Sequence, residues 1–239
     1  MDKDSQGSVK MSCLCIITAR GGSKRIPRKN IKEFLGKPII AYSISAALEA
    51  GIFDEVMVST DDSEIAEVSK NFGAKVPFMR SEFASSDYAS TRDVLVEVLN
   101  EYEKRGKTFE YFSCVYPTAP FVTPEKLKNA FDLLKSSDAD EIMPVIQFSY
   151  PPQRAFVIKD GGLVYQYPQY EFSRSQDLEP IYHDCGQFYF YRTDIYRGLE
   201  KGTGKRLPLI MPEEETQDID NISDWLLAEI KYRRFILHE

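Results

Sequence analysis

Short apolar runs alternate with segments of helical periodicity over more than half of this sequence. The runs at residues 13–18, 55–59 and 111–116 are rich in β-branched and aromatic residues, as are strands that helices cover on both faces. A loop and then a helical pattern follow each run. This βαβα order predicts an α/β fold with a doubly wound, mostly parallel sheet.

Helix start and stop signals support the same order. Thr123 and Pro124 form a cap and first-turn pair, and Gly51 ends an earlier apolar pattern as glycine commonly does. The expected helices run from Pro38 to Gly51, from Asp62 or Ser63, after Thr91, after Pro124, and from a Ser223 cap to about Leu237.

The rhythm changes over residues 148–184, where prolines, paired glycines and many aromatic residues replace the helix formers. We expect an excursion from the sheet here, in the form of a hairpin arm used in oligomerisation. Residues 186–191 then return as a strand. Because no repeat or interdomain linker is visible, residues 11–239 are expected to form one domain that carries this small extension.

Composition excludes several classes of protein. With 43% apolar residues among 239, the chain can bury a large core, which excludes wholesale disorder. No apolar run approaches the roughly 20 residues of a membrane-spanning helix, and residues 1–10 lack the apolar stretch of a secretory signal. Four cysteines do not make a disulfide framework. We therefore expect a cytoplasmic protein with no membrane partner.

One loop concentrates positive charge. Residues 20–37 hold seven bases and one acid, whereas the whole chain has a net charge of −7. Such a loop favours a local anionic ligand over a nucleic-acid track, and its position after a strand and two glycines favours phosphate. It matches neither G-x-G-x-x-G nor a P-loop, since Ile31 stands where the P-loop needs its first glycine. The alternative interpretation is a solvated basic turn or a nuclear localisation signal.

Asp218 and Asp220 form the second candidate feature. In an extended segment alternate residues share a face, so both carboxylates point the same way while Ile219 points into the core. Two adjacent carboxylates repel unless a cation joins them, and Mg²⁺ accepts one or two carboxylates with phosphate and water oxygens. The pair predicts a Mg²⁺ site only together with the phosphate loop, because alone it is more typical of a surface turn.

These motifs give the chain a family resemblance. It resembles the CMP-sialic acid synthetases, which are cytidylyltransferases of nonulosonic acids, over residues 13–237. The motifs are I-T-A-R-G-G-S-K-R-I-P-R-K-N at 17–30, G-K-P at 36–38, V-S-T-D at 58–61, Y-P-T-A-P at 116–120 and D-I-D at 218–220. Similarity to the pseudaminic acid branch of that family rests on R-I-P-R at 25–28, I-I-A-Y-S at 39–43, F-S-Y-P at 148–151, R-S-Q-D-L-E at 174–179 and Y-H-D-C-G-Q-F-Y at 182–189.

The resemblance implies a fold, an assembly and a reaction. The fold is that of the nucleotide-diphospho-sugar transferases, and the assembly is a homodimer whose extension reaches towards the partner's active site. In the reaction, the anomeric hydroxyl of an acidic nine-carbon sugar attacks the α-phosphorus of CTP, a CMP-sugar forms and pyrophosphate leaves. Such a transfer needs positioned charge rather than a His, Ser or Cys nucleophile.

The resemblance also implies a role for individual residues. Arg20 and Lys29 would be catalytic, because they would hold the triphosphate and stabilise charge on the phosphorus centre. Asp218 and Asp220 would bind Mg²⁺. The CTP-binding set would be Ala19, Arg20, Gly22, Ser23, Lys29, Asn30, Arg80 and Thr91, and the sugar-binding set Tyr116, Tyr150, Gln153, Arg174, Asp184 and Gln187.

Two departures from the sialic acid branch fall at acceptor-sugar positions. Tyr116 stands where that branch commonly has Gln, and residues 183–186 read H-D-C-G where it has R-P-N-G. An aromatic wall suits a deoxygenated diacetamido sugar, so pseudaminic acid is the expected substrate. Legionaminic acid and N-acetylneuraminic acid are the alternatives within this fold. The alternative outside catalysis is a protein that binds nucleotides or nucleic acid through the basic loop, although we expect no nucleic-acid partner.

Overall fold

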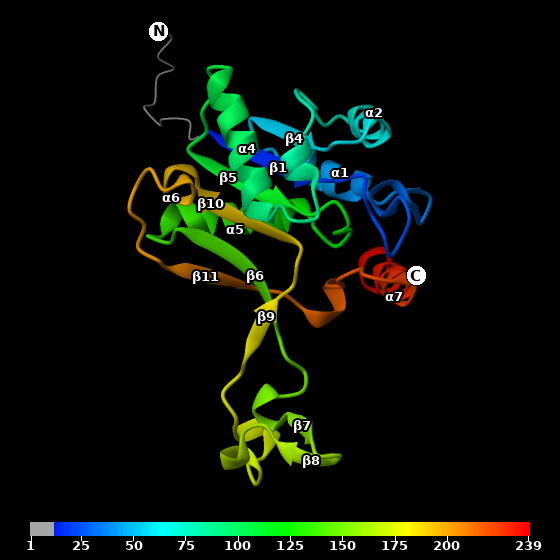
Figure 1. Cartoon of the computed structure of the whole chain (residues 1–239), viewed down its shortest axis with the longest axis vertical. Coiled ribbons are helices and arrows are strands. Elements are labelled where there is room, and N and C mark those ends of the chain that lie inside the picture. The colour runs from blue at the N-terminus through cyan, green and yellow to red at the C-terminus, as the bar shows by residue number, and fades with distance from the viewer. Residues whose placement is uncertain (1–11) are drawn as a thin grey trace.

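A central sheet with helices on both faces organises residues 12–239, which are the residues that this computed structural model describes. Its strands are β1 Cys13–Thr18, β4 Glu55–Ser59, β5 Tyr111–Val115, β6 Glu141–Gln147, β9 Tyr182–Asp184, β10 Phe188–Arg192 and β11 Arg206–Ile210. Their order is β11-β6-β10-β5-β1-β4, with β9 on the edge of β6 (Figure 1). Of these strands, β9 and β10 run against the rest. The predicted mostly parallel α/β sheet is therefore confirmed.

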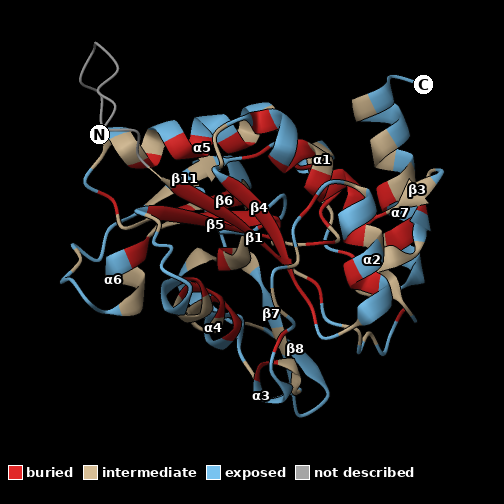
Figure 2. Cartoon of the chain, turned by 90° about the horizontal axis from the view of Figure 1, so that it is seen from above, coloured by how far each residue is buried: buried red, intermediate tan, exposed pale blue. Residues whose placement is uncertain are grey.

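Helices cover both faces of the sheet. Alternate residues of β1 point to opposite faces, and each set packs against helices on its own side. Cys13, Cys15 and Ile17 lie in one buried cluster with residues of the first and fifth helices. Leu14 and Ile16 lie in a second cluster with the fourth helix, so the strands are buried between the helical layers (Figure 2). The helices are α1 Ile40–Ala50, α2 Ser63–Asn71, α3 Glu82–Ser85, α4 Thr91–Lys104, α5 Pro124–Ser136, α6 Thr193–Arg197 and α7 Ile222–Lys231, which continues as a π-helical turn over Tyr232–Leu237.

An arm projects away from the sheet between β6 and β9 (Figure 1). We call residues 148–181 the arm. It contains the hairpin of β7 Phe156–Lys159 and β8 Gly162–Tyr165 and three 3₁₀ turns, Pro152–Arg154, Pro168–Tyr170 and Ser175–Asp177. The segment therefore contains a hairpin that leaves the sheet, and its use in oligomerisation stays a prediction. The excursion is shorter at its end than expected, because the last three residues of the predicted range form β9 against β6.

The capping signals account for the accurate and the inaccurate helix starts. Thr123 caps α5 by accepting a hydrogen bond from the Lys126 N–H at 3.3 Å. The predicted Ser223 cap is wrong, because Ser223 lies inside α7 and Asn221 forms a capping box with Asp224. Pro38 likewise ends the short hairpin of β2 Glu33–Phe34 and β3 Lys37–Pro38, so α1 begins at Ile40. The third predicted strand ends one residue early, at Val115.

A third apolar cluster joins the two predicted motifs. Ile26 from the basic loop and Ile219 from between the aspartates are both about 1% exposed. They share a cluster with Phe34 and with Trp225 of α7. Burial of these side chains brings residues almost 200 positions apart into one region, because removing apolar surface from water favours their contact.

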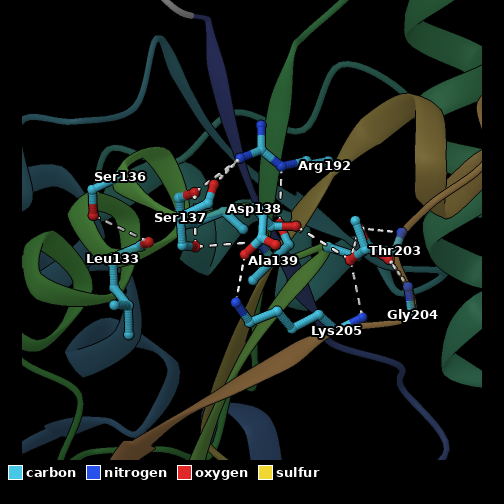
Figure 3. Close-up of polar contacts among 11 residues, drawn as sticks. Leu133, Ser136, Ser137, Asp138, Ala139, Arg192, Thr203, Gly204 and Lys205 are labelled. Carbon is cyan, nitrogen blue, oxygen red and sulfur yellow. Dashed lines mark hydrogen bonds and ion pairs between the residues drawn. The ribbon is translucent and has the colours of Figure 1, made fainter.

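Arg192 joins the carboxyl end of α5 to the sheet (Figure 3). Its guanidinium donates to the carbonyl oxygens of Leu134 at 3.0 Å, Ser137 at 2.8 Å and Ala139 at 2.9 Å. It also donates to the Tyr111 hydroxyl at 3.0 Å. The last carbonyls of a helix have no partner further along the helix, and Arg192 supplies a charged donor to one of them, Leu134, and to two carbonyls of the segment that follows α5.

Replacing Arg192 with Met is expected to lower the free energy of unfolding by about 3 kcal/mol, since several acceptors lose a charged donor. Urea denaturation followed by the fluorescence of Trp225, the sole tryptophan, measures this. The matched control is Arg206→Met, which removes the single ion pair between the exposed Arg206 and Glu141 and should cost about 0.5 kcal/mol. Equal losses in the two variants would show that Arg192 does not have this role.

The predicted domain begins at residue 11, and residues 1–11 lie outside the described part of the chain. Within residues 12–239, no helix combines the length and the apolar character needed to cross a membrane.

Candidate active site

A cavity of about 540 Å³ opens where β1 and β5 end. Parallel sheets commonly bind ligands beyond the carboxyl ends of their strands. The walls come from four parts of the chain: the basic loop, residues 80–94, residues 116–118 and Asp220. Eight of the predicted site residues line it, namely Arg20, Ser23, Lys29, Asn30, Arg80, Thr91, Tyr116 and Asp220.

Backbone and side-chain hydrogen bonds fix the basic loop at the cavity mouth. The Asn30 side-chain amide donates to the Arg20 carbonyl oxygen at 2.8 Å, which joins the two ends of the loop. The Gly21 N–H donates to Asp61 at 2.9 Å. A Cβ atom at Gly21 would lie 2.8 Å from a carboxylate oxygen of Asp62, so this position requires glycine.

Two predicted CTP-binding residues of the loop do not line the cavity. Ala19 is fully buried and its N–H donates to the Ser59 carbonyl oxygen at 2.9 Å, which extends the β1–β4 pairing. Gly22 has open space around its Cβ position. Binding through their backbone groups stays a prediction for both.

Lys29 crosses from the loop to the segment that carries the aspartates. Its Nζ donates to the Ile219 carbonyl oxygen at 2.6 Å. Burial lowers the pKa of Lys29, and the charges of Asp220 and Asp218 oppose that change. The ammonium group of this cavity-lining residue therefore lies at the backbone between the two aspartates.

The Asp218–Asp220 segment has the predicted alternation, with Ile219 buried between the two carboxylates. Asp220 lines the cavity and forms an ion pair with Arg25 at 2.6 Å. The pKa of Asp218 is raised, chiefly by burial and also by the like charge of Asp220.

The donor set fits a Mg²⁺ ion shared with a nucleotide. Within residues 12–239, no group of three or more acidic, His or Cys side chains forms a metal cage. Two carboxylates, of which Asp220 lines the cavity and Asp218 does not, instead match the usual Mg²⁺ arrangement, in which substrate phosphates and waters supply the remaining ligands. The repulsion between the aspartates would favour the binding of such a cation.

Asp87 is a cavity residue that the sequence analysis missed. It accepts from Arg20 at 3.0 Å and from Lys24 at 2.5 Å, and both bases line the cavity. The pKa of Asp87 is lowered, chiefly by its hydrogen bond with Lys24. Nothing in the sequence indicated this pairing, because it joins the basic loop to the turn between α3 and α4.

Arg80 and Thr91 form the opposite wall. Arg80 is buried and donates to the hydroxyl of Ser59 at 3.1 Å and to its carbonyl oxygen at 2.7 Å. Burial lowers the pKa of Arg80. Thr91 is the first residue of α4, whose N-terminus faces the cavity with Ser90 as its cap. A helix N-terminus is a favourable environment for anionic ligands.

Tyr116 forms the wall at the end of β5. Its N–H donates to the Gln187 carbonyl oxygen at 2.9 Å, and its ring meets the edge of Tyr189 at 5.8 Å. The Tyr189 hydroxyl in turn donates to Asp184 at 2.6 Å. Burial raises the pKa of Tyr116. Asp184 and Gln187 are thus connected to the cavity through Tyr116 and Tyr189, although neither lines it.

The remaining predicted sugar-binding residues lie at or in the arm, outside the cavity lining (Figure 1). Tyr150 is 87% exposed, and Arg174 pairs with Asp177 at 2.7 Å. Gln153 is buried and donates to the Glu179 carbonyl oxygen at 2.7 Å. Within the described chain, these three residues are therefore not brought together with the basic loop.

Known proteins share this fold and much of this sequence. The family profile described as "Cytidylyltransferase" matches residues 14–225. The chain belongs to the cytidylyltransferase family. A Campylobacter jejuni relative named pseudaminic acid cytidylyltransferase is 42% identical over 227 residues, which cover 93% of this chain and 97% of the relative. A Legionella pneumophila relative named CMP-N,N'-diacetyllegionaminic acid synthase is 32% identical, with 92% and 95% covered.

Solved structures agree on the fold of this cytidylyltransferase. CMP:2-keto-3-deoxy-manno-octonic acid synthetase, solved in complex with CTP, matches with a TM-score of 0.65 at 20% identity, covering 92% of this chain and 97% of that one. The 4-diphosphocytidyl-2C-methyl-D-erythritol synthase of Anaerococcus prevotii matches with a TM-score of 0.65 at 13% identity, covering 95% and 100%. The expected nucleotide-diphospho-sugar transferase-like architecture is therefore confirmed.

The site of this nucleotidyltransferase presents several cations and no cysteine thiol. Arg20, Lys24, Arg25 and Lys29 line the cavity. All four cysteines are buried and unpaired, and none lines the cavity. This arrangement can bind a triphosphate and stabilise charge that develops on its phosphorus and leaving group.

Proposed function

We propose that this cytidylyltransferase transfers CMP from CTP to the anomeric hydroxyl of pseudaminic acid and releases pyrophosphate. The observation that carries the proposal is the 42% identity, over 93% of the chain, with a relative named pseudaminic acid cytidylyltransferase. The cavity supports the same reaction, because five bases and Asp220 line one space.

We infer that the triphosphate lies along the basic loop. Arg20 and Lys29 would neutralise the phosphates, and Lys29 would stabilise the charge that grows on pyrophosphate as it leaves. Asp218 and Asp220 would hold Mg²⁺, which when bound supplies a Lewis acid for the phosphate oxygens. Ser23 and Asn30, with the backbone of Ala19 and Gly22, would contact the nucleotide.

Cytosine and ribose would lie against the opposite wall. Arg80 and Thr91 border that part of the cavity, and Arg80 is held in place by Ser59. Because Arg80 is buried and fixed, its charge is available to the ligand with little loss of side-chain freedom. The chain has unpaired, buried cysteines, so we propose that it acts in the reducing cytoplasm.

We propose that the acceptor sugar is bound between the Tyr116 wall and the arm of a second copy in a homodimer. The arm exposes large apolar side chains, among them Ile158 at 77%, Leu163 at 71% and Phe172 at 92%. Patches of this kind commonly mark protein interfaces. Residues 11–239 would then act as one domain whose arm supplies Tyr150, Gln153 and Arg174 to the partner, with Arg174 on the sugar carboxylate.

Mixing two inactive variants tests this shared site. Lys29→Ala copies keep the arm, and Arg174→Ala copies keep the basic loop. An equal mixture is expected to recover about a quarter of the wild-type rate, because half the dimers are mixed and each of those has one intact site. A mixture that stays as inactive as its components would show that each chain uses its own arm.

The substrate is tested by pyrophosphate release from CTP and Mg²⁺ with pseudaminic, legionaminic or N-acetylneuraminic acid. Release with pseudaminic acid alone is expected. Release with another of the three would keep the reaction and overturn the assignment of the sugar. CTP binding without release from any of them would favour an untested sugar or a non-catalytic nucleotide-binding protein.

A further inference from the structure

We propose that Arg28 is a positioning residue of the basic loop, which locks the turn that directs Lys29 into the cavity. The inference rests on the proposed function in that Lys29 is taken to meet the triphosphate. Arg28 is the exception among the bases at residues 20–29, because the other four line the cavity and it does not. Its guanidinium contacts Asp62 instead of the cavity.

The guanidinium of Arg28 is held by the start of α2. It forms a two-pronged contact with Asp62, donating through one nitrogen to Oδ2 and through the other to Oδ1 at 3.0 Å. It also donates to Glu64. Paired, parallel hydrogen bonds of this kind fix the orientation of both groups. The pKa of Asp62 is lowered to about 2, chiefly by its hydrogen bond with Arg28.

The backbone of Arg28 adopts an unusual conformation. Its φ of 56° and ψ of 30° lie in the left-handed region, which a residue with a Cβ atom seldom occupies. The turn Lys29–Ile31 begins directly after it, and the N–H groups of Ile31 and Lys32 both donate to the Arg28 carbonyl oxygen at 3.0 Å. The direction of Lys29 therefore depends on this one residue, and a strained conformation persists where its surroundings fix it.

Asp62 is a rigid anchor for this turn. Its Oδ1 caps α2 by accepting from the N–H groups of Glu64 and Ile65, both at 3.0 Å. The preceding residue, Asp61, accepts from Gly21. Two consecutive aspartates after β4 thus hold the basic loop at two points, the first at Gly21 and the second at Arg28.

A double-mutant cycle on the Kd for CTP, measured by calorimetry with Mg²⁺ present, tests the inference without depending on turnover. Arg28→Gln and Lys29→Ala should each raise the Kd roughly tenfold, and the double variant should be no worse than Lys29→Ala. Arg28→Gly should match Arg28→Gln, because it relieves the backbone strain but also lacks the contact with Asp62. The proposal would be overturned if the increase in Kd of the double variant were the product of the two single increases, or if Arg28→Gln left the Kd unchanged.

Hydrogen exchange supplies a readout that a general loss of stability would not give. Arg28→Gln and Asp62→Asn should speed exchange in residues 20–32 while the melting temperature stays close to that of the wild type, since Asn still caps α2. Lys32→Gln is the control, because it removes a charge from the same loop but contacts Trp225 instead of Asp62. Unchanged exchange in the loop would overturn the role of Arg28, whereas absent turnover in the wild type would overturn only the proposed function.

Discussion

Replacing Asp218 with Asn is expected to lower kcat by about a thousandfold while the protein stays folded. The pKa of Asp218 is already raised by burial and by Asp220, so the pair carries unfavourable negative charge that a bound cation would relieve. Asparagine keeps the shape of the side chain and removes the charge that would hold Mg²⁺. Initial rates of pyrophosphate release at increasing Mg²⁺ concentrations measure the effect.

The control for Asp218→Asn is Glu214→Gln, which removes an exposed carboxylate four residues earlier in the same segment. Its rate should match that of the wild type. Fluorescence of the buried Trp225 reports whether each variant is folded, because this side chain packs with Ile219 beside the aspartate pair. EDTA should stop the wild-type enzyme and excess Mg²⁺ should restore it. Full activity in Asp218→Asn would remove the metal assignment.

Local signals predicted the first half of the fold well. The bounds of β1 and β4 match the predicted runs, because a fully buried strand has to be apolar along its whole length. The strand predicted over residues 186–191 is present as β10 Phe188–Arg192, whereas β6, β9 and β11 were not predicted. Pro144 lies within β6 and Pro208 within β11, and proline argues against a strand when the neighbours are unknown. The pairing of β6 with β11 joins distant segments, and no local pattern encodes it.

The candidate site was predicted in composition better than in geometry. A run of bases after a strand indicated a phosphate loop, and the structure brings that loop to Asp220 through the packing of Ile26 with Ile219. Which bases face the ligand could not be read from the sequence. Arg28 and Lys29 are neighbours of the same charge, and the left-handed backbone at Arg28 separates their directions. Asp87 was missed because its ion pairs form across the loop boundary.

Replacing Lys29 with Ala is expected to lower kcat/KM for CTP by about a thousandfold, since a cavity-lining cation held at the backbone between the two aspartates is lost. Burial lowers the pKa of Lys29, so this lysine loses its proton at a lower pH than an exposed one. A lysine is charged below its pKa, and the charged form is the one that stabilises phosphate. The wild-type kcat/KM should therefore fall on the alkaline side as pH rises through that pKa.

The variant Lys29→Arg separates charge from shape at this position. Arginine stays protonated throughout the alkaline range, so the kcat/KM of Lys29→Arg should not fall at alkaline pH. Because the shape of the side chain differs, this kcat/KM should be lower than that of the wild type. Lys128→Ala, on the exposed face of α5, should keep both the wild-type rate and the wild-type pH profile. If Lys29→Arg kept the alkaline fall, a group other than Lys29 would set it. If Lys29→Ala lowered kcat/KM by less than tenfold, Lys29 would be a structural contact with Ile219 rather than a ligand of the triphosphate.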